Sequence, residues 1–306
     1  MKRRHCLLTL LAASWAPAAE HLPQKRTFIG VDRFAEHLPQ KRTFIGVDRF
    51  QRLVALAKAR NWRAQPIGQR VALFGQAMLG TKYVAWTLEI DDHVESPSVT
   101  FLGLDCWTFF ETSLGLARMI ETPREVYTPS DLLREIERTR YRGGVCRGNY
   151  LDRIHYLDEW FTDNAARGHV RYITSQIGPV VRMQGRSNDE MSLNPRLYRY
   201  LKANPALVPA LNQIERRLER VPFDYIPKAQ VAACESRLRS GDIIGIVTHR
   251  DHVFCSHVGL AIQMADGRCH LMHASSTAKK VLIDKPLHDY LAGVKAHAGI
   301  VVARAA

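Results

Sequence analysis

The sequence predicts an α+β fold in which one apolar helix packs against an antiparallel sheet. The first observation is a helical pattern of apolar residues that begins at Cys106, directly after Asp105. The second is the last third of the chain, which consists of short β-branched or alternating runs separated by Gly and Asp. Between these regions, residues from about 130 to 235 mix helical signals with Pro-rich connections. We expect a largely helical insertion there.

The first eighteen residues predict a secretory signal peptide. Positions 2–4 are basic, positions 6–15 form a short apolar stretch, and positions 16–18 provide a small-residue cleavage site. We therefore expect cleavage near Ala18/Ala19 and a periplasmic or secreted protein. No segment has the roughly eighteen apolar residues that a membrane helix needs, so no transmembrane segment is predicted.

Residues 19–34 and 35–50 are the same sixteen-residue sequence, repeated once. A solenoid has at least three diverging repeats, so this identity indicates a recent duplication or an assembly error. The second copy continues directly into the pattern at residue 51. We therefore expect it to hold the native position at the edge of a single domain over residues 51–306, with the first copy as a redundant, disordered extension.

The elements of this domain follow from the spacing of apolar residues. From residue 51 to about 79 the spacing is near 3.6, which predicts helical structure. Residues 80–84 predict an extended segment, and helix resumes at Cys106 with Asp105 as its N-cap. The predicted strands of the last third are residues 242–247, 257–262, 270–273, 281–284 and 299–303.

Cys106 is a candidate nucleophile because it begins a helix. The unpaired N–H groups and the macrodipole of a helix N-terminus favour an anion, so this position predicts a lowered thiol pKa. A lone cysteine on an apolar helix face is nevertheless more often part of the core. The two histidines His257 and His273, on successive predicted strands, favour catalysis because a thiol nucleophile needs an imidazole base and a group that orients it.

The two imidazoles can meet only if the loop between their strands has the right length. A two-residue turn at Asp266 and Gly267 would pair residue 260 with His273 and turn its side chain to the wrong face. A three-residue loop, residues 265–267 with Gly267 left-handed, would pair residue 259 with His273 instead. The catalytic interpretation therefore predicts the longer loop.

Composition and charge limit the classes of binding partner that the sequence predicts. The chain is 46% hydrophobic and 24% charged, as in globular proteins, and its formal net charge is +13. For an exported protein, such charge fits a cell-wall or membrane surface. Basic residues are scattered without interleaved aromatic residues, so no nucleic-acid partner is predicted. The absence of a CxxC pair argues against structural zinc, and no metal or cofactor is expected.

Five cysteines remain after the predicted cleavage. An odd number leaves one free thiol in an oxidising compartment, and Cys106 fits that role. The other four either form two disulfides, in any of three pairings, or are small buried hydrophobic residues. They are Cys146, Cys234, Cys255 and Cys269.

Several motifs together resemble a known family. Residues 104–106, 241–244, 256–259 and 272–275 resemble, in order and type, the motifs of the NlpC superfamily of papain-like cell-wall hydrolases, and residues 80–84 fit the segment that supplies a tyrosine beside the nucleophile. Within that superfamily, the chain is similar to the N-acetylmuramoyl-L-alanine amidase-like family, formerly a domain of unknown function. The further matching segments are residues 87–89, 153–156, 224–228 and 299–304.

The resemblance implies a papain-like core and a thiol amidase. Cys106 would attack an amide carbonyl, His257 would take its proton, and His273 would orient His257. The substrate would be peptidoglycan or a muropeptide, cut between N-acetylmuramic acid and L-alanine. The implied substrate-binding and oxyanion residues are Tyr83, Asp105, His155 and Tyr156, and the alternative for the last two is a half-buried helix surface.

The sequence departs from the family pattern at two positions. It also leaves two other functions open. Trp86 stands where a glycine is usual, and Trp107 stands where a smaller residue usually follows the cysteine. Both are expected to narrow or reshape the groove. The sequence does not choose between the amidase, an endopeptidase that cuts inside the stem peptide, and a non-catalytic wall-binding module. It also leaves the oligomeric state open.

Overall fold

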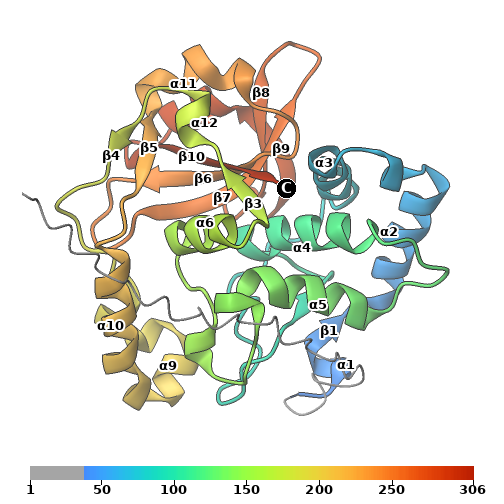
Figure 1. Ribbon diagram of the computed structural model, residues 1–306, viewed down its shortest axis with the longest axis horizontal. Coiled ribbons are helices and arrows are strands. Elements are labelled where there is room, and N and C mark those ends of the chain that lie inside the picture. Colours follow the sequence, from blue (N-terminus) through green and yellow to red (C-terminus); the bar gives the residue numbers. More distant parts are fainter. Residues whose placement is uncertain (1–37) are drawn as a thin grey trace, which may run out of the picture. The chain divides into compact units, whose positions relative to one another are not determined.

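The computed structural model describes residues 38–306 (Figure 1). The predicted signal peptide and the first copy of the repeat lie outside the described residues. Among residues 38–306, no helix is long and apolar enough to span a membrane.

The second copy of the repeat forms the first elements of the fold. It comprises α1 (Gln40–Thr43), β1 (Phe44–Ile45) and the beginning of α2 (Val47–Ala59). Strand β1 pairs in parallel with β2 (Val99–Thr100). Phe44 and Phe50 are 3% and 1% exposed, and their rings meet edge to face at 5.3 Å. The folded unit therefore begins before residue 51, inside the second copy.

The helical pattern predicted up to residue 79 is divided into two helices. α2 ends at Ala59, a short 3₁₀ turn follows at Trp62–Ala64, and α3 spans Ile67–Ala77. Asn61 adopts a φ of 48° at this break, and Pro66 immediately precedes α3. Periodicity alone did not separate the two helices because their apolar residues face the same core.

Helix α4 (Cys106–Met119) is the central helix of the fold. Asp105 is its N-cap, as predicted, and the Asp105 side chain accepts a hydrogen bond from the Thr108 backbone N–H. Nearly every residue of α4 is buried. It packs against α3 and α5 (Pro129–Arg140) and against strands β7 and β8 of the sheet. This packing holds the first residue of α4 beside the sheet.

The sheet confirms the α+β prediction. The five predicted strands are present, the first shifted by one residue and the other four longer than predicted: β6 (Ile243–Thr248), β7 (Cys255–Gln263), β8 (Cys269–Ser275), β9 (Lys280–Pro286) and β10 (His297–Ala305). They pair antiparallel in the order β10-β6-β7-β8-β9. The C-terminal strand β10 therefore lies inside the sheet rather than at its edge.

The insertion is less purely helical than expected. Its helices are α6 (Leu157–Ala166), α7 (Thr174–Ile177), α8 (Glu190–Leu193), α9 (Arg199–Ala203), α10 (Val208–Leu218) and α11 (Lys228–Cys234). It also contributes strands β3 (Val170–Tyr172), β4 (Val181–Arg182) and β5 (Asp224–Pro227), which extend the sheet beyond β10. These strands are too short to produce an alternating pattern in the sequence.

Helices cover both faces of the sheet (Figure 1). On one face, Val258, Leu260 and Met272 join the apolar cluster that contains α3 and α4. On the other, Ala261 and Leu271 pack with α11 and α12 (Leu287–Ala292). Neighbouring positions of β7 and β8 therefore face different helices, as the alternation of a strand requires.

Candidate functional site

The β7–β8 hairpin has the register that the catalytic interpretation requires. Leu260 pairs with Met272, which places residue 259 opposite His273. The loop is closed by a hydrogen bond from the Met264 N–H to the Arg268 carbonyl, and Gly267 is left-handed with a φ of 76°. The three-residue loop over positions 265–267 is therefore confirmed.

This register brings the two imidazoles together. The distance from His257 Nε2 to His273 Nδ1 is 2.6 Å, and the rings are nearly perpendicular. Gly259 lies between them on the same face. A Cβ at that position would approach the His273 Cβ to 3.0 Å and the Met272 carbonyl oxygen to 2.8 Å. The missing side chain of Gly259 thus provides the space in which the two rings meet.

Asp284 extends the hydrogen-bonded pair of His257 and His273. This role was not predicted from the sequence. The distance from His273 Nε2 to Asp284 Oδ2 is 3.2 Å. Leu282 pairs with His273 in the register of β8 and β9, so position 284 lies on the same face of the sheet. Asp284 is the last residue of a predicted strand, and the alternation of that strand is the signal that would have revealed it.

The direction of the hydrogen bonds fixes the tautomers of both neutral rings. The Asp284 carboxylate can only accept, so His273 carries its proton on Nε2 and presents a bare Nδ1. His257 must then donate from Nε2, which leaves His257 Nδ1 unprotonated. A bare Nδ1 is the atom that can accept a proton from a thiol.

Tyr290 of α12 closes this face, and no sequence pattern pointed to it. Its ring lies 5.3 Å from that of His273 and 6.4 Å from that of His257, and it stacks on His297 at 5.3 Å. Burial, together with the charges of Asp284 and Cys106, raises the pKa of Tyr290. Tyr290 remains a neutral phenol beside the two imidazoles.

The Cys106 thiol lies at the start of α4, against the β7 backbone. N–H groups of Val258 and Trp107 favour its thiolate, but burial and then the Asp105 carboxylate outweigh them and raise its pKa to about 12. The predicted lowering of this pKa is therefore wrong. The helix N-terminus does act in the expected direction, but low solvation and a neighbouring negative charge have larger effects.

Both imidazoles are also neutral at physiological pH. Burial lowers the pKa of His257 to about 3, and the neighbouring His273 and His297 act in the same direction. Burial also lowers the pKa of His273, although Asp284 opposes this shift. The resting site is thus a neutral thiol beside neutral imidazoles rather than a preformed ion pair.

The chain is similar to known proteins. The profile of the N-acetylmuramoyl-L-alanine amidase-like family matches residues 73–300. The chain belongs to this family.

Solved structures also resemble this chain. An N-acetylmuramoyl-L-alanine amidase from Bacteroides uniformis is 32% identical, with 78% of this chain and 99% of that chain covered and a TM-score of 0.71. A Bacteroides fragilis protein named as a candidate xylanase is 33% identical, over 75% and 98% of the two chains, with a TM-score of 0.68. A Legionella pneumophila structure, 19% identical over 83% and 94% with a TM-score of 0.62, shares the fold. No curated protein sequence is a significant match.

Two further residues implied by the amidase-like resemblance lie next to the thiol. Tyr83 forms a parallel bridge with Leu104, and Cys106 and Asp105 raise its pKa, after the larger effect of burial. Asp105 has a different role from the implied one. Its carboxylate accepts hydrogen bonds from Thr108 and Thr87. It caps the helix, and its negative charge could not stabilise an oxyanion.

The other two implied residues pack against neighbouring side chains of the insertion. Tyr156 is only 5% exposed, and its hydroxyl donates to Glu215 Oε1 at 2.6 Å. His155 Nε2 lies 3.0 Å from the Tyr150 carbonyl oxygen, and its ring packs on that of Tyr150 at 4.4 Å. Burial, with Arg153 and Arg142, lowers the pKa of His155 well below its usual value. These contacts place both residues in the packing of the insertion, and a substrate-binding role for them stays a prediction.

The two departures from the family pattern differ in their consequences. Trp107 is 9% exposed and packs on Phe110 in the core, so it does not reach the groove. Trp86 is 58% exposed and adopts a φ of 64°, a conformation that favours glycine. Of the two tryptophans, only Trp86 is exposed.

Two further features of the described residues concern the other four cysteines and the grouping of side chains that could bind a metal ion. Cys146, Cys234, Cys255 and Cys269 are free and buried, so none of them forms a disulfide. Over residues 38–306, no group of three or more His, Cys, Asp or Glu side chains is arranged to hold a metal ion.

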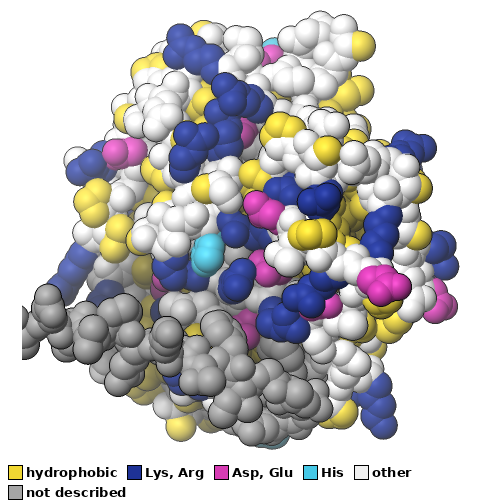
Figure 2. All heavy atoms as spheres, turned by 45° about the vertical axis from the view of Figure 1, so that its right-hand side comes forward, with side chains coloured by type: hydrophobic (Ala, Val, Ile, Leu, Met, Phe, Trp, Pro, Cys, Tyr) yellow, Lys and Arg dark blue, Asp and Glu magenta, His cyan; other side chains and the backbone are white. Residues whose placement is uncertain are grey.

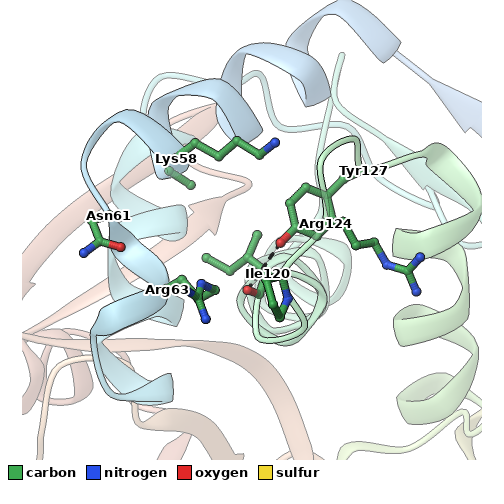
Figure 3. A pocket seen from close by; sticks show the side chains of 8 residues that line it. Lys58, Asn61, Arg63, Ile120, Arg124 and Tyr127 are labelled. Carbon is green, nitrogen blue, oxygen red and sulfur yellow. Dashed lines mark hydrogen bonds between the residues drawn. The ribbon is translucent and has the colours of Figure 1, made fainter.

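The surface carries mixed charge, and a cavity lies away from the candidate site. Lys and Arg side chains are spread over the face drawn in Figure 2, with acidic and hydrophobic side chains between them. A cavity of about 230 Å³ lies between α2 and the end of α4, and its lining includes Lys58, Ile120 and Tyr127 (Figure 3). It contains none of Cys106, His257 and His273, so it is separate from the candidate site.

Proposed function

We propose that the protein is a cysteine-dependent amidase that cleaves the bond between N-acetylmuramic acid and L-alanine in peptidoglycan or its fragments, outside the cytoplasm. The observation that carries the proposal is the hydrogen-bonded series of His257, His273 and Asp284, together with the Val258 N–H, next to His257 in β7, that bonds the Cys106 thiol. This series leaves an unprotonated nitrogen on His257, in a chain of the amidase-like family.

The first half of the reaction transfers the acyl group to the enzyme. Sγ of Cys106 attacks the lactyl carbonyl carbon while its proton moves to His257 Nδ1. The tetrahedral oxyanion receives hydrogen bonds from the Cys106 backbone N–H and the Tyr83 hydroxyl. The carbon–nitrogen bond then breaks, and the alanine nitrogen takes the proton from His257. The products of this half are a free stem peptide and a muramoyl thioester.

The second half releases the acyl group. Water gives a proton to His257 Nδ1 and attacks the thioester carbonyl, and the thiolate leaves and regains that proton. Because thiol and imidazole are both neutral at rest, proton transfer must accompany attack. His273 and Asp284 hold the His257 ring and stabilise its positive charge during each step.

Digestion of a defined N-acetylmuramoyl peptide tests the proposal. We expect mass spectrometry to show a free peptide that begins with L-alanine, and we expect Cys106→Ala to abolish its formation. Cys234→Ala is the matched control, because it removes a buried thiol from α11. A cut after the D-glutamyl residue would instead identify an endopeptidase. Turnover by Cys106→Ala, or sacculus binding by an inactive wild-type protein, would exclude the thiol mechanism.

A further inference from the structure

Trp86 combines two properties that are rarely found together in a folded protein. Its large side chain is 58% exposed, and its backbone is left-handed with a φ of 64°. Non-glycine residues in this conformation are strained, and such strain clusters at functional sites. An exposed, strained tryptophan therefore requires an explanation other than packing.

Hydrogen bonds hold the Trp86 segment against the start of α4. The Thr87 N–H donates to Asp105 Oδ2 at 3.1 Å, and the Thr87 hydroxyl donates to the same oxygen at 2.8 Å. The Glu89 N–H donates to the Trp86 carbonyl oxygen at 3.2 Å. Asp105 directly precedes Cys106. The segment that carries Trp86 is thus fixed to the residue next to the nucleophile.

The insertion supplies a second aromatic side chain. Tyr198, just before α9, meets Trp86 edge to face, with ring centroids 5.6 Å apart. Tyr198 is partly buried, whereas Trp86 is exposed. We name Trp86 and Tyr198 the aromatic pair. It joins the catalytic part of the fold to the insertion at the edge of the site.

The charges around the aromatic pair indicate a neutral ligand. The carboxylates of Glu190, Glu89 and Glu215 act on Tyr198, after the larger effect of burial, and raise its pKa. Arg250 opposes them and pairs with Glu190 at 3.6 Å, and Glu89 pairs with Arg153 at 3.3 Å. These paired charges give the free carboxylates of a stem peptide little net attraction. An amide-linked muramoyl sugar is uncharged.

We propose that the aromatic pair is a carbohydrate subsite, in which Trp86 packs against the pyranose ring of the muramoyl group. This inference rests on the proposed function, since the sugar adjoins the scissile carbonyl through its lactyl ether and must therefore bind near Cys106. The C–H face of a pyranose is apolar and suits an aromatic ring. Aromatic side chains with few polar groups are usual in such sites.

The test compares two substrates with the same scissile amide. One is N-acetylmuramoyl-L-alanyl-D-isoglutamine, and the other is the lactoyl dipeptide that lacks the sugar. We expect Trp86→Gly to raise KM for the first by about tenfold, with kcat and the KM of the second unchanged. Glycine accepts the φ of this position, so the loop keeps its shape. Trp86→Phe should restore part of the affinity. Tyr198→Leu should weaken the binding of only the sugar-bearing substrate.

Controls and a binding measurement separate this inference from the proposed function. Val126→Ala, at an exposed residue just before α5, should change neither KM. Calorimetry in a Cys106→Ala background measures affinity for the sugar-bearing dipeptide without turnover. If Trp86→Gly leaves that affinity unchanged, the subsite is wrong even if wild type is an amidase. If wild type proves inactive but its affinity depends on Trp86, the subsite stands and the proposed reaction fails. Equal effects on both substrates, or faster turnover by Trp86→Gly, would also overturn the subsite.

Discussion

The protonation states of Cys106 and His257 determine how the thiol can react. The pKa of Cys106 is about 12 and that of His257 is about 3. Between these values the thiol keeps its proton and the imidazole lacks one. His257 therefore stays unprotonated even in mild acid, because its pKa lies below the usual range of histidine.

Alkylation of Cys106 by iodoacetamide provides a direct test of this state. At pH 7.5 we expect a rate at least about 100-fold below that of free cysteine, because the reactive thiolate is scarce. The rate should rise about tenfold per pH unit up to pH 10 without a plateau. The Cys106→Ala protein, treated identically, corrects for the buried thiols. A plateau between pH 5 and 7 would instead indicate a thiolate–imidazolium pair.

Asp284 is expected to act as a positioning residue through His273. An asparagine would offer its amide N–H to His273 Nε2 and so favour the wrong tautomers along the series. We expect Asp284→Asn to lower kcat by roughly 100-fold or more with KM unchanged, and Asp284→Glu to restore part of the loss. Asp266→Asn is the matched control, because Asp266 also pairs with a histidine, His270, at 2.9 Å. Equal losses in the two asparagine variants would exclude a specific role.

At the scale of elements, the β7–β8 loop determines whether the site exists. Deleting Asp266 would create the two-residue turn, which pairs residue 260 with His273 and turns the imidazole away from His257. We expect that deletion to abolish activity. Inserting two glycines after Asp266 keeps the parity, and the exposed loop should tolerate it. Comparing peptide release by the two variants tests this, and similar activity in both would contradict the role of the register.

The sequence predicted elements with strong patterns and missed those without them. The hairpin, its loop and the N-cap at Asp105 could be found because alternation, a left-handed glycine and helix capping each leave a local signal. Strands β3 to β5 have no such signal because none is longer than four residues, and helix α12 has none because its six residues make fewer than two turns. Tyr290 was missed with α12. The raised pKa of Cys106 was missed because solvation depends on the assembled fold.

At the scale of the whole molecule, single substitutions can show which copy of the repeat belongs to the folded unit. Deleting either copy gives the same sequence, so deletion does not reveal which copy is folded. Phe50 is buried in the core, and we expect Phe50→Ala to cost about 3–5 kcal/mol of stability and roughly 10 °C in Tm. Phe34→Ala, the identical change in the first copy, should leave Tm unchanged. Equal shifts in the two melting curves would show that the first copy is not redundant.

The position of β10 has a consequence for synthesis of the protein. Cys106 and α4 leave the ribosome early, but β10 pairs with β6, β5 and β3 inside the sheet. Until residues 297–305 emerge, β6 lacks one neighbour and the sheet that supports the two histidines is incomplete. We therefore expect a premature stop that removes only β10 to leave an inactive protein, in which Cys106 is present but the strand next to the one that carries His257 lacks its neighbour.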